Sequence, residues 1–138
     1  HSMGGHGALT LALSNPGHFE SVSAFAPICN PMKSDWGQKQ FEAYLGNDHA
    51  AWEKHDATVL MRSNGTKCPV LIDTGTDDQF YDLLGTSAFA AAVADQKVEA
   101  SIRLQKGYDH SYFFISTFMP EHIEFHANAL TRKSGNII

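Results

Sequence analysis

The stretch PVLIDTG, residues 69–75, is nearly continuous in apolar residues and closes on a glycine. Such a run is typical of a strand buried on both faces, as in the middle of a parallel sheet. Two further strand-like runs lie at residues 21–28 and 100–105, one on each side of it along the chain. Helical patterns separate the three runs. We therefore predict an α/β fold of about three parallel strands, flanked by helices and joined by right-handed crossovers.

The helical segments are predicted at residues 3–14, 86–96 and 111–130, with two or three short helices between residues 30 and 63. In the long segment at 111–130 the apolar stripe is expected to hold Ile115, Phe118, Met119, Ile123 and His126. Pro120 is expected to kink or split that helix. Residues 1–138 are predicted to form one domain, with 131–138 as a frayed tail.

Composition excludes several classes of function. The chain has 138 residues and a net charge of −5, without a basic stripe, which argues against a nucleic-acid partner. No apolar run reaches the ~18–20 residues of a membrane span, and no signal-peptide pattern precedes the first helix. The two cysteines, Cys29 and Cys68, lie far apart in the sequence. Free thiols and a cytoplasmic location are therefore expected, although one disulfide is possible from the sequence.

Three loops that are expected at the carboxyl ends of parallel strands carry a serine, an acid and a histidine, in that order. Ser2 precedes the first helix, Asp77 and Asp78 follow the strand ending at Gly75, and His110 follows the strand ending at Gln105. Because such ends meet at one edge of a parallel sheet, these side chains are expected to be neighbours. Serine, acid, histidine is also the chain order of an α/β-hydrolase triad. Asp78 is the favoured acid, with Asp77 next.

The residues around Ser2 fit a nucleophile on a tight turn between a strand and a helix. A serine hydroxyl attacks only when an imidazole removes its proton, and the imidazole needs a carboxylate to hold its tautomer. Gly4 fits the second glycine of the pattern G-x-S-x-G, and small residues near such a turn allow its backbone to pack. The backbone N–H of Met3 is expected to donate to the oxyanion, helped by the helix that follows.

Four blocks of sequence then identify a family: His1–Ala8, Ala24–Pro31, Asp77–Phe80 and Gly107–Ile115. In this order they resemble S-formylglutathione hydrolases of the esterase D family, and the resemblance runs from His1 to about Leu130. It implies the C-terminal half of an α/β-hydrolase fold. It also implies a serine esterase and thioesterase that splits S-formylglutathione into glutathione and formate, in formaldehyde detoxification, without a metal or cofactor. By resemblance the nucleophile is Ser2, the acid Asp78 and the base His110.

Several alternatives stay open on the sequence alone. The same residues would serve an acyltransferase, or the chain could be an inactive remnant, because the family's N-terminal half is missing from it. The isolated chain is accordingly expected to be nearly inactive. It is also expected to form a homodimer, or to associate with that missing half, through the unpaired edge of the strand at residues 21–28.

The remaining candidates concern the pocket and a metal site. Trp36 and Tyr108 are candidate substrate-binding residues, with core packing as the alternative. His1 and His6 flank the nucleophile and could shape the pocket. His122 and His126 stand one helical turn apart, a metal-ligand spacing, but no third ligand is evident. We therefore interpret them as half-exposed helix residues and predict no metal.

Overall fold

The computed structural model describes the backbone of residues 1–135 and the side chains of residues 1–132. In chain order its elements are α1 (Ser2–Ser14), β1 (Val22–Phe25), the 3-10 turn η1 (Pro31–Lys33), α2 (Asp35–Leu45), α3 (His49–Glu53), α4 (Ala57–Asn64), β2 (Val70–Gly75), α5 (Tyr81–Leu84), α6 (Thr86–Gln96), β3 (Ala100–Gln105) and α7 (Tyr112–Gly135). Among these described residues no helix is long and apolar enough to cross a membrane.

The three strands form a parallel sheet, as the sequence predicts, and they lie in the order β1-β2-β3. Val70 of β2 lies opposite Val22 of β1 on one side and opposite Ala100 of β3 on the other. All six residues of β2 are buried, which explains the continuous apolar run at residues 69–75. Within the described part of the chain β1 has one strand neighbour, so its other edge is open.

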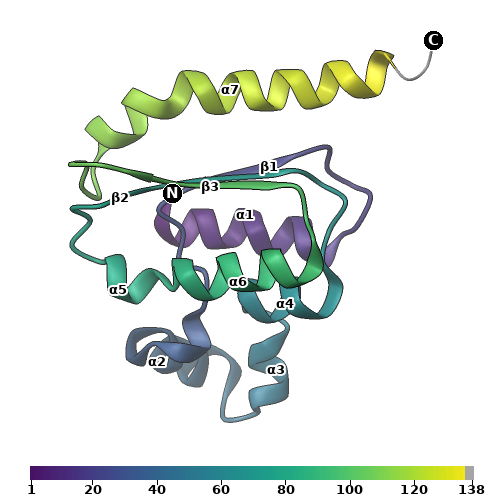
Figure 1. The fold of residues 1–138 in the computed structure, drawn as a ribbon. Helices are drawn as coiled ribbons and strands as arrows, with labels where there is room; N and C mark the ends of the chain where they lie inside the picture. The colour runs from purple at the N-terminus through teal and green to yellow at the C-terminus, as the bar shows by residue number, and fades with distance from the viewer. Residues whose placement is uncertain (136–138) are drawn as a thin grey trace.

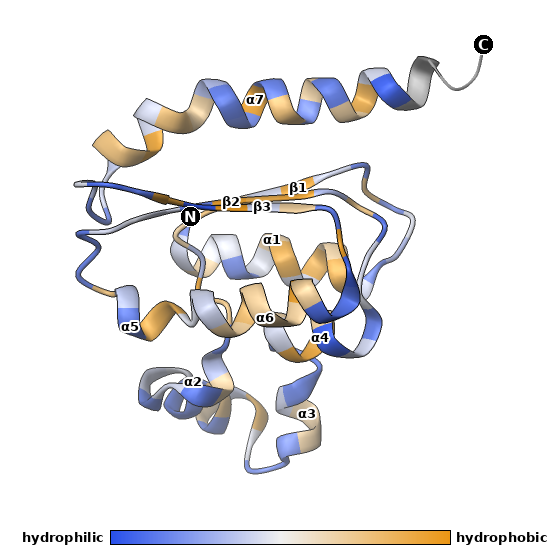
Figure 2. Ribbon diagram, in the orientation of Figure 1, coloured by the Kyte–Doolittle hydropathy of each residue, from blue (hydrophilic) through white to orange (hydrophobic). Residues whose placement is uncertain are grey.

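Helices cover the two faces of the sheet unequally (Figure 1). Helices α1, α4 and α6 lie against one face, with α2 and α3 beyond them, whereas α7 alone lies over the other face. Figure 2 shows apolar residues along much of α6 and in the second half of α1. The larger core joins these helices to the strands through, among others, Leu9, Leu13, Met61, Ile72 and Phe89. Burying each such side chain stabilises the fold by about 1.5–3 kcal/mol.

A buried aspartate fixes the start of α4 and the segment before α2. Asp56 is 0% exposed and accepts hydrogen bonds from the backbone N–H groups of Thr58 (2.9 Å) and Val59 (3.1 Å), which satisfies two free donors of the helix. Its other oxygen accepts from the N–H of Met32 at 3.0 Å. Burial raises the pKa of this carboxyl, although the three hydrogen bonds oppose the rise. The contact ties residues 30–33 to α4.

The first strand is shorter than the run 21–28 suggests. It ends at Phe25 because Ala26 adopts a φ of +43°, in the left-handed region, and the chain turns there. The N–H of Ala26 still donates to the carbonyl of Asp73 at 2.7 Å. The turn carries Pro27 and Ile28 away from the sheet and toward α1.

Helix α7 differs from the sequence predictions at several points. It is not split at Pro120 but continues as one helix, because a proline removes a single N–H donor and the rest of the hydrogen-bond ladder remains. Met119 is 39% and Ile123 62% exposed, so the predicted stripe is wrong at these two positions. The side facing the sheet instead carries Phe114, Phe118, His122, His126 and Ala129. The helix also extends to Gly135, into the predicted tail, of which 136–138 lie outside the described residues.

Candidate active site

Ser2 is the first residue of α1 and has a φ of +53°, in the left-handed region that non-glycine residues rarely adopt. Strain of this kind concentrates at functional sites, and it is the geometry of a serine on a strand-to-helix turn. The carbonyl of Ser2 accepts a hydrogen bond from Ile28 N–H at 3.2 Å, which ties the turn to the segment after β1. Ser2 is thereby placed at the carboxyl end of the sheet.

Of the glycines just after Ser2, Gly5 is the one whose missing side chain allows a close backbone approach. A Cβ on Gly5 would lie 2.9 Å from the Cβ of Pro27 and 3.3 Å from that of Ala24, so α1 approaches the end of β1 only because the side chain is absent. A Cβ on Gly4 would meet nothing within 4 Å among the described residues. The assignment of Gly4 to the pattern G-x-S-x-G stays a prediction.

Asp78 and His110 are joined by a hydrogen bond of 2.7 Å between Oδ2 and Nδ1. The side chain of Asp78 is fully buried, and its other oxygen accepts from Phe80 N–H at 2.8 Å. The ring of Phe80 stands edge-on to that of His110, with centroids 5.1 Å apart. Asp77, the alternative acid, is exposed, and its carboxylate contacts the hydroxyl of Thr76 instead.

Ser2, the third candidate, is related to this pair through its neighbour in the sequence, His1. The ring of His1, which precedes Ser2, packs on the ring of His110 at a centroid distance of 4.3 Å. With Nδ1 occupied by Asp78, the Nε2 atom of His110 remains for a second partner. In the part of the chain that the structure describes, no hydrogen bond joins it to Ser2. The structure thus links the acid to the base, and it packs His1, the residue before Ser2, on the base.

A cavity of about 310 Å³ lies beside the N-terminal end of α1. Most of its wall is apolar, and it is lined by Met3, His6, Thr10, Ile28, Pro31, Trp36, Gly37, Gln40, Phe41, Tyr44, Leu45 and His55. Of the two predicted pocket residues, Trp36 lines this cavity. Tyr108 lies instead in an aromatic cluster with Phe113, Phe114 and Phe118, at centroid distances of 5.0–6.1 Å.

His6 is held neutral in this wall. Burial, with a smaller contribution from the charge of His55, lowers the pKa of His6 to about 4. Its Nε2 atom accepts the N–H of Ala57 at 3.3 Å, a bond that a protonated ring could not make. His6 therefore presents an uncharged imidazole to the cavity at neutral pH.

The structure reveals no metal site among the residues it describes, and it corrects the prediction for one of the helix histidines. His122, predicted to be half-exposed, is 2% exposed and its Nε2 binds Asp73 at 2.7 Å. His126 is partly buried and contacts the hydroxyls of Ser21 (2.6 Å) and Ser23 (2.8 Å). Both rings anchor α7 to the sheet. His122 belongs to a group of hydrogen-bonded side chains around Asp73, which sequence reasoning missed. The signal that could have revealed this group is an aspartate inside an apolar strand.

The two cysteines are unpaired thiols in the described residues. Cys29 is fully buried, and its Sγ lies 3.4 Å from the carbonyl oxygen of Pro27. Cys68 is partly buried. Burial raises the pKa of both thiols above the ordinary value, and each therefore stays protonated at neutral pH.

Comparisons with known proteins point to esterases. The family model Esterase, described as "Putative esterase", matches residues 1–125. The chain is 58% identical over 130 residues to S-formylglutathione hydrolase of Paracoccus denitrificans, and 53% identical over 133 residues to that of Rattus norvegicus. Each alignment covers 94% of this chain and 47% of the relative, so the chain spans about half the length of these curated relatives.

Solved structures place the fold. An S-formylglutathione hydrolase from Agrobacterium tumefaciens superposes with a TM-score of 0.90 at 46% identity, over 94% of this chain and 47% of that one. Esterase B from Lactobacillus rhamnosis superposes with a TM-score of 0.77 at 18% identity, over 98% of this chain and 53% of that one, and this shows the fold alone. On the match of the family model over residues 1–125, the chain belongs to the esterase family and has an α/β-hydrolase fold.

Proposed function

We propose that this chain supplies the catalytic residues of a serine thioesterase and carboxylesterase that hydrolyses S-formylglutathione to glutathione and formate. The single observation that carries the proposal is the 2.7 Å bond between buried Asp78 and His110, whose ring packs on that of His1, the residue before Ser2. The substrate is proposed from the relatives, which are named S-formylglutathione hydrolases at 58% and 53% identity.

In the proposed reaction His110 Nε2 takes the proton of Ser2 as Ser2 Oγ attacks the formyl carbon. Asp78 on Nδ1 keeps the ring in the tautomer that has a free Nε2, and stabilises the imidazolium that forms. The tetrahedral oxyanion accepts from the Met3 N–H at the start of α1. Collapse breaks the carbon–sulfur bond, and the glutathione sulfur leaves with the proton from His110. Water then attacks the formyl-serine with His110 as base, which releases formate and restores Ser2.

The cavity lined by Trp36 is proposed to receive part of the substrate. The cavity lies next to Met3, and its wall is mostly apolar with a neutral His6. Such a wall suits an uncharged portion of the thioester or ester rather than a carboxylate. Tyr108, in its aromatic cluster, is proposed to support the His110 loop rather than to contact substrate.

The test uses a chimera in which the 130 aligned residues replace the matching segment of the Paracoccus denitrificans relative. Release of glutathione thiol and of formate from S-formylglutathione is measured for the chimera, for its Ser2→Ala variant and for Ser14→Ala, an exposed serine at the other end of α1. Ser2→Ala should lower kcat by at least about 10⁴-fold and Ser14→Ala should leave it unchanged. A Ser2→Ala chimera that keeps the parent rate would refute the assignment.

The isolated 138-residue chain forms a second arm of that assay. This fold draws one oxyanion donor from the residue after the nucleophile and another from an early loop that precedes it in the chain. We expect the isolated chain to be slower by at least about 10²–10³-fold, the usual cost of losing one such donor. Equal rates for the chain and the chimera would contradict this expectation.

We further propose that the chain associates through the open edge of β1. The N–H groups of Val22 and Ala26 donate toward β2, so by strand alternation those of Ser23 and Phe25 point outward. An unpaired edge of this kind recruits a further strand, either from a second copy or from another segment of the parent enzyme. Sedimentation equilibrium of the 138-residue chain should give a dimer, and a monomer at every concentration would overturn the self-association.

A further inference from the structure

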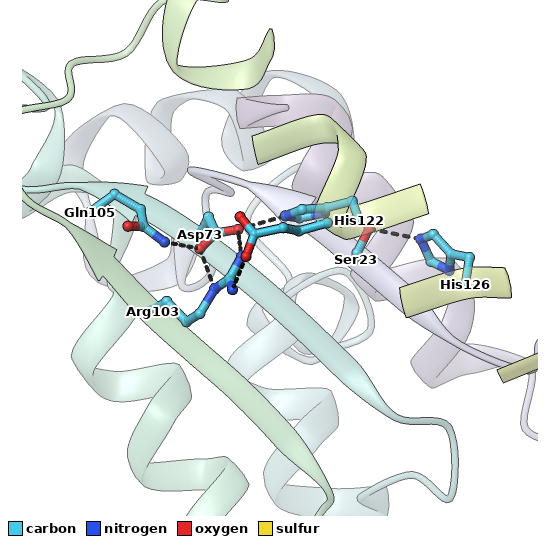
Figure 3. A network of polar contacts seen from close by, with 7 residues as sticks. Ser23, Asp73, Arg103, Gln105, His122 and His126 are labelled. Atoms are coloured by element: carbon cyan, nitrogen blue, oxygen red, sulfur yellow. Dashed lines mark hydrogen bonds and ion pairs between the residues drawn. The ribbon is translucent and has the colours of Figure 1, made fainter. Parts of the chain in front are cut away.

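A buried carboxylate in the middle of the sheet gathers three side chains from two other elements (Figure 3). Asp73 of β2 is fully buried and accepts both Nε and Nη2 of Arg103, each at 2.7 Å. It also accepts Gln105 Nε2 at 2.9 Å and His122 Nε2 at 2.7 Å. In the described part of the chain none of these groups makes a hydrogen bond or ion pair with Ser2, Asp78 or His110, so the proposed reaction leaves them unused.

The charge of Asp73 is well compensated. Burial by itself raises the pKa of its carboxyl, but the hydrogen bonds from His122, Arg103 and Gln105 outweigh burial and hold that pKa far below its usual range. A buried carboxylate strongly destabilises a fold unless it is paired and hydrogen-bonded in this way. Apolar side chains of similar volume would stabilise the sheet without that cost, which raises the question of what the directional bonds achieve.

The bonds fix how three elements lie relative to one another. Arg103 is directly opposite Asp73 in the β2–β3 register, and Gln105 is opposite Gly75, two residues further on. His122 brings α7 onto the same carboxylate, while its ring stacks on Phe25 of β1 at a centroid distance of 3.9 Å. Apolar contacts tolerate small slides and rotations, whereas four hydrogen bonds to one carboxylate do not.

These same elements carry the acid and the base. Asp78 lies three residues beyond the end of β2, and His110 lies between the end of β3 and the start of α7. The two loops are joined directly: Thr76 N–H donates to Gln105 O (3.0 Å), and Asp77 N–H donates to Tyr108 O (3.0 Å). Gly75 allows this approach, because a Cβ there would collide with Tyr108 O. A register change of one residue, about 3.3 Å, would therefore separate the 2.7 Å partners.

We propose that Asp73 is a positioning residue for the Asp78–His110 pair: it locks the register of β2 against β3 and the rotation of α7, and so sets the distance between the acid and the base. The kinetic consequence rests on the proposed function. The geometric one does not, because it concerns a hydrogen bond within the chain. Loss of Asp73 should therefore disturb His110 more than its effect on overall stability explains.

The first experiment reads the Asp78–His110 bond in the 138-residue chain by proton NMR. The proton on His110 Nδ1, held by the buried Asp78, should give a downfield resonance that disappears in His110→Gln. Asp73→Asn should broaden or shift that resonance. Val93→Ala is the matched control, because it removes buried volume from α6 in the larger core, away from both loops. An unchanged resonance in folded Asp73→Asn would overturn the proposal.

The second experiment measures kinetics in the chimera. Asp73→Asn should lower kcat by about 10–100-fold with KM changed less than twofold, since a misplacement of about 1 Å can cost 10²-fold. Val93→Ala should keep the parent kcat. Should Asp73→Asn fail to fold, Arg103→Lys takes its place, because it keeps the charge but loses the two-pronged geometry. Parent-like kcat in folded Asp73→Asn or Arg103→Lys refutes the proposal. A chimera inactive throughout would instead refute the proposed function and leave the NMR result to decide.

Discussion

Acidification should destabilise this chain through His6. In the folded state the ring is neutral, because burial and the nearby His55 lower its pKa to about 4 and because Nε2 accepts the N–H of Ala57. In the unfolded chain the same ring should titrate near its ordinary value of about 6.5. Between these two values the unfolded chain binds a proton that the folded chain does not.

The sign and the size follow from this difference. Above about pH 6.5 neutral His6 makes its full contribution to the free energy of unfolding. This contribution is lost as the pH falls from about 6.5 to about 4, and below about pH 4 His6 causes no further loss. Each pKa unit corresponds to about 1.4 kcal/mol, so the whole window is worth roughly 3 kcal/mol. That is a large part of the stability of a small domain.

Urea denaturation followed by fluorescence of Trp36 and Trp52 measures the effect at a series of pH values from 7.5 to about 4. His126, whose pKa is also lowered by burial, acts in the same direction, so the difference between wild type and His6→Gln isolates His6. His18→Gln, an exposed histidine, is the matched control and should follow wild type. Parallel pH curves for wild type and His6→Gln would refute the reasoning.

Three further predictions concern packing and reactivity. Gly75→Ala should lower the free energy of unfolding by about 2 kcal/mol or more, because the new Cβ collides with Tyr108 O. Gly7→Ala should raise that free energy by about 0.5–1 kcal/mol, because a Cβ at this position of α1 meets none of the described residues within 4 Å. The midpoints of urea denaturation test both variants. Phe114→Ala should cost about 3–5 kcal/mol, seen as a lower melting temperature, because the ring is fully buried; a loss below 1 kcal/mol would contradict its place in the core. Titration with a thiol reagent in urea without reductant should find both cysteines free, and in the folded chain Cys68 should react first, because Cys29 is fully buried.

The sequence by itself determined the number of strands, their parallel pairing and the bounds of some elements. The apolar run 69–75 could only be a doubly buried strand, and residues 86–96 and 100–105 match α6 and β3 residue for residue. These signals are local, because periodicity and turn residues act within a few positions of the chain. The same reasoning placed Asp78 and His110 at one edge of the sheet, since parallel strands bring their carboxyl ends together.

Only the tertiary structure decided which face of α7 is buried and what holds it there. The stripe through Met119 and Ile123 looks apolar, yet the helix turns His122 inward, because Asp73 offers a buried carboxylate on the facing strand. That contact joins residues 49 positions apart, and no periodicity within α7 could reveal it. The hydrophobic effect is non-directional, so it determines that α7 packs on the sheet but not its rotation. The rotation and the position of the helix along the sheet depend on a directional hydrogen bond to a charged partner that is distant in the sequence.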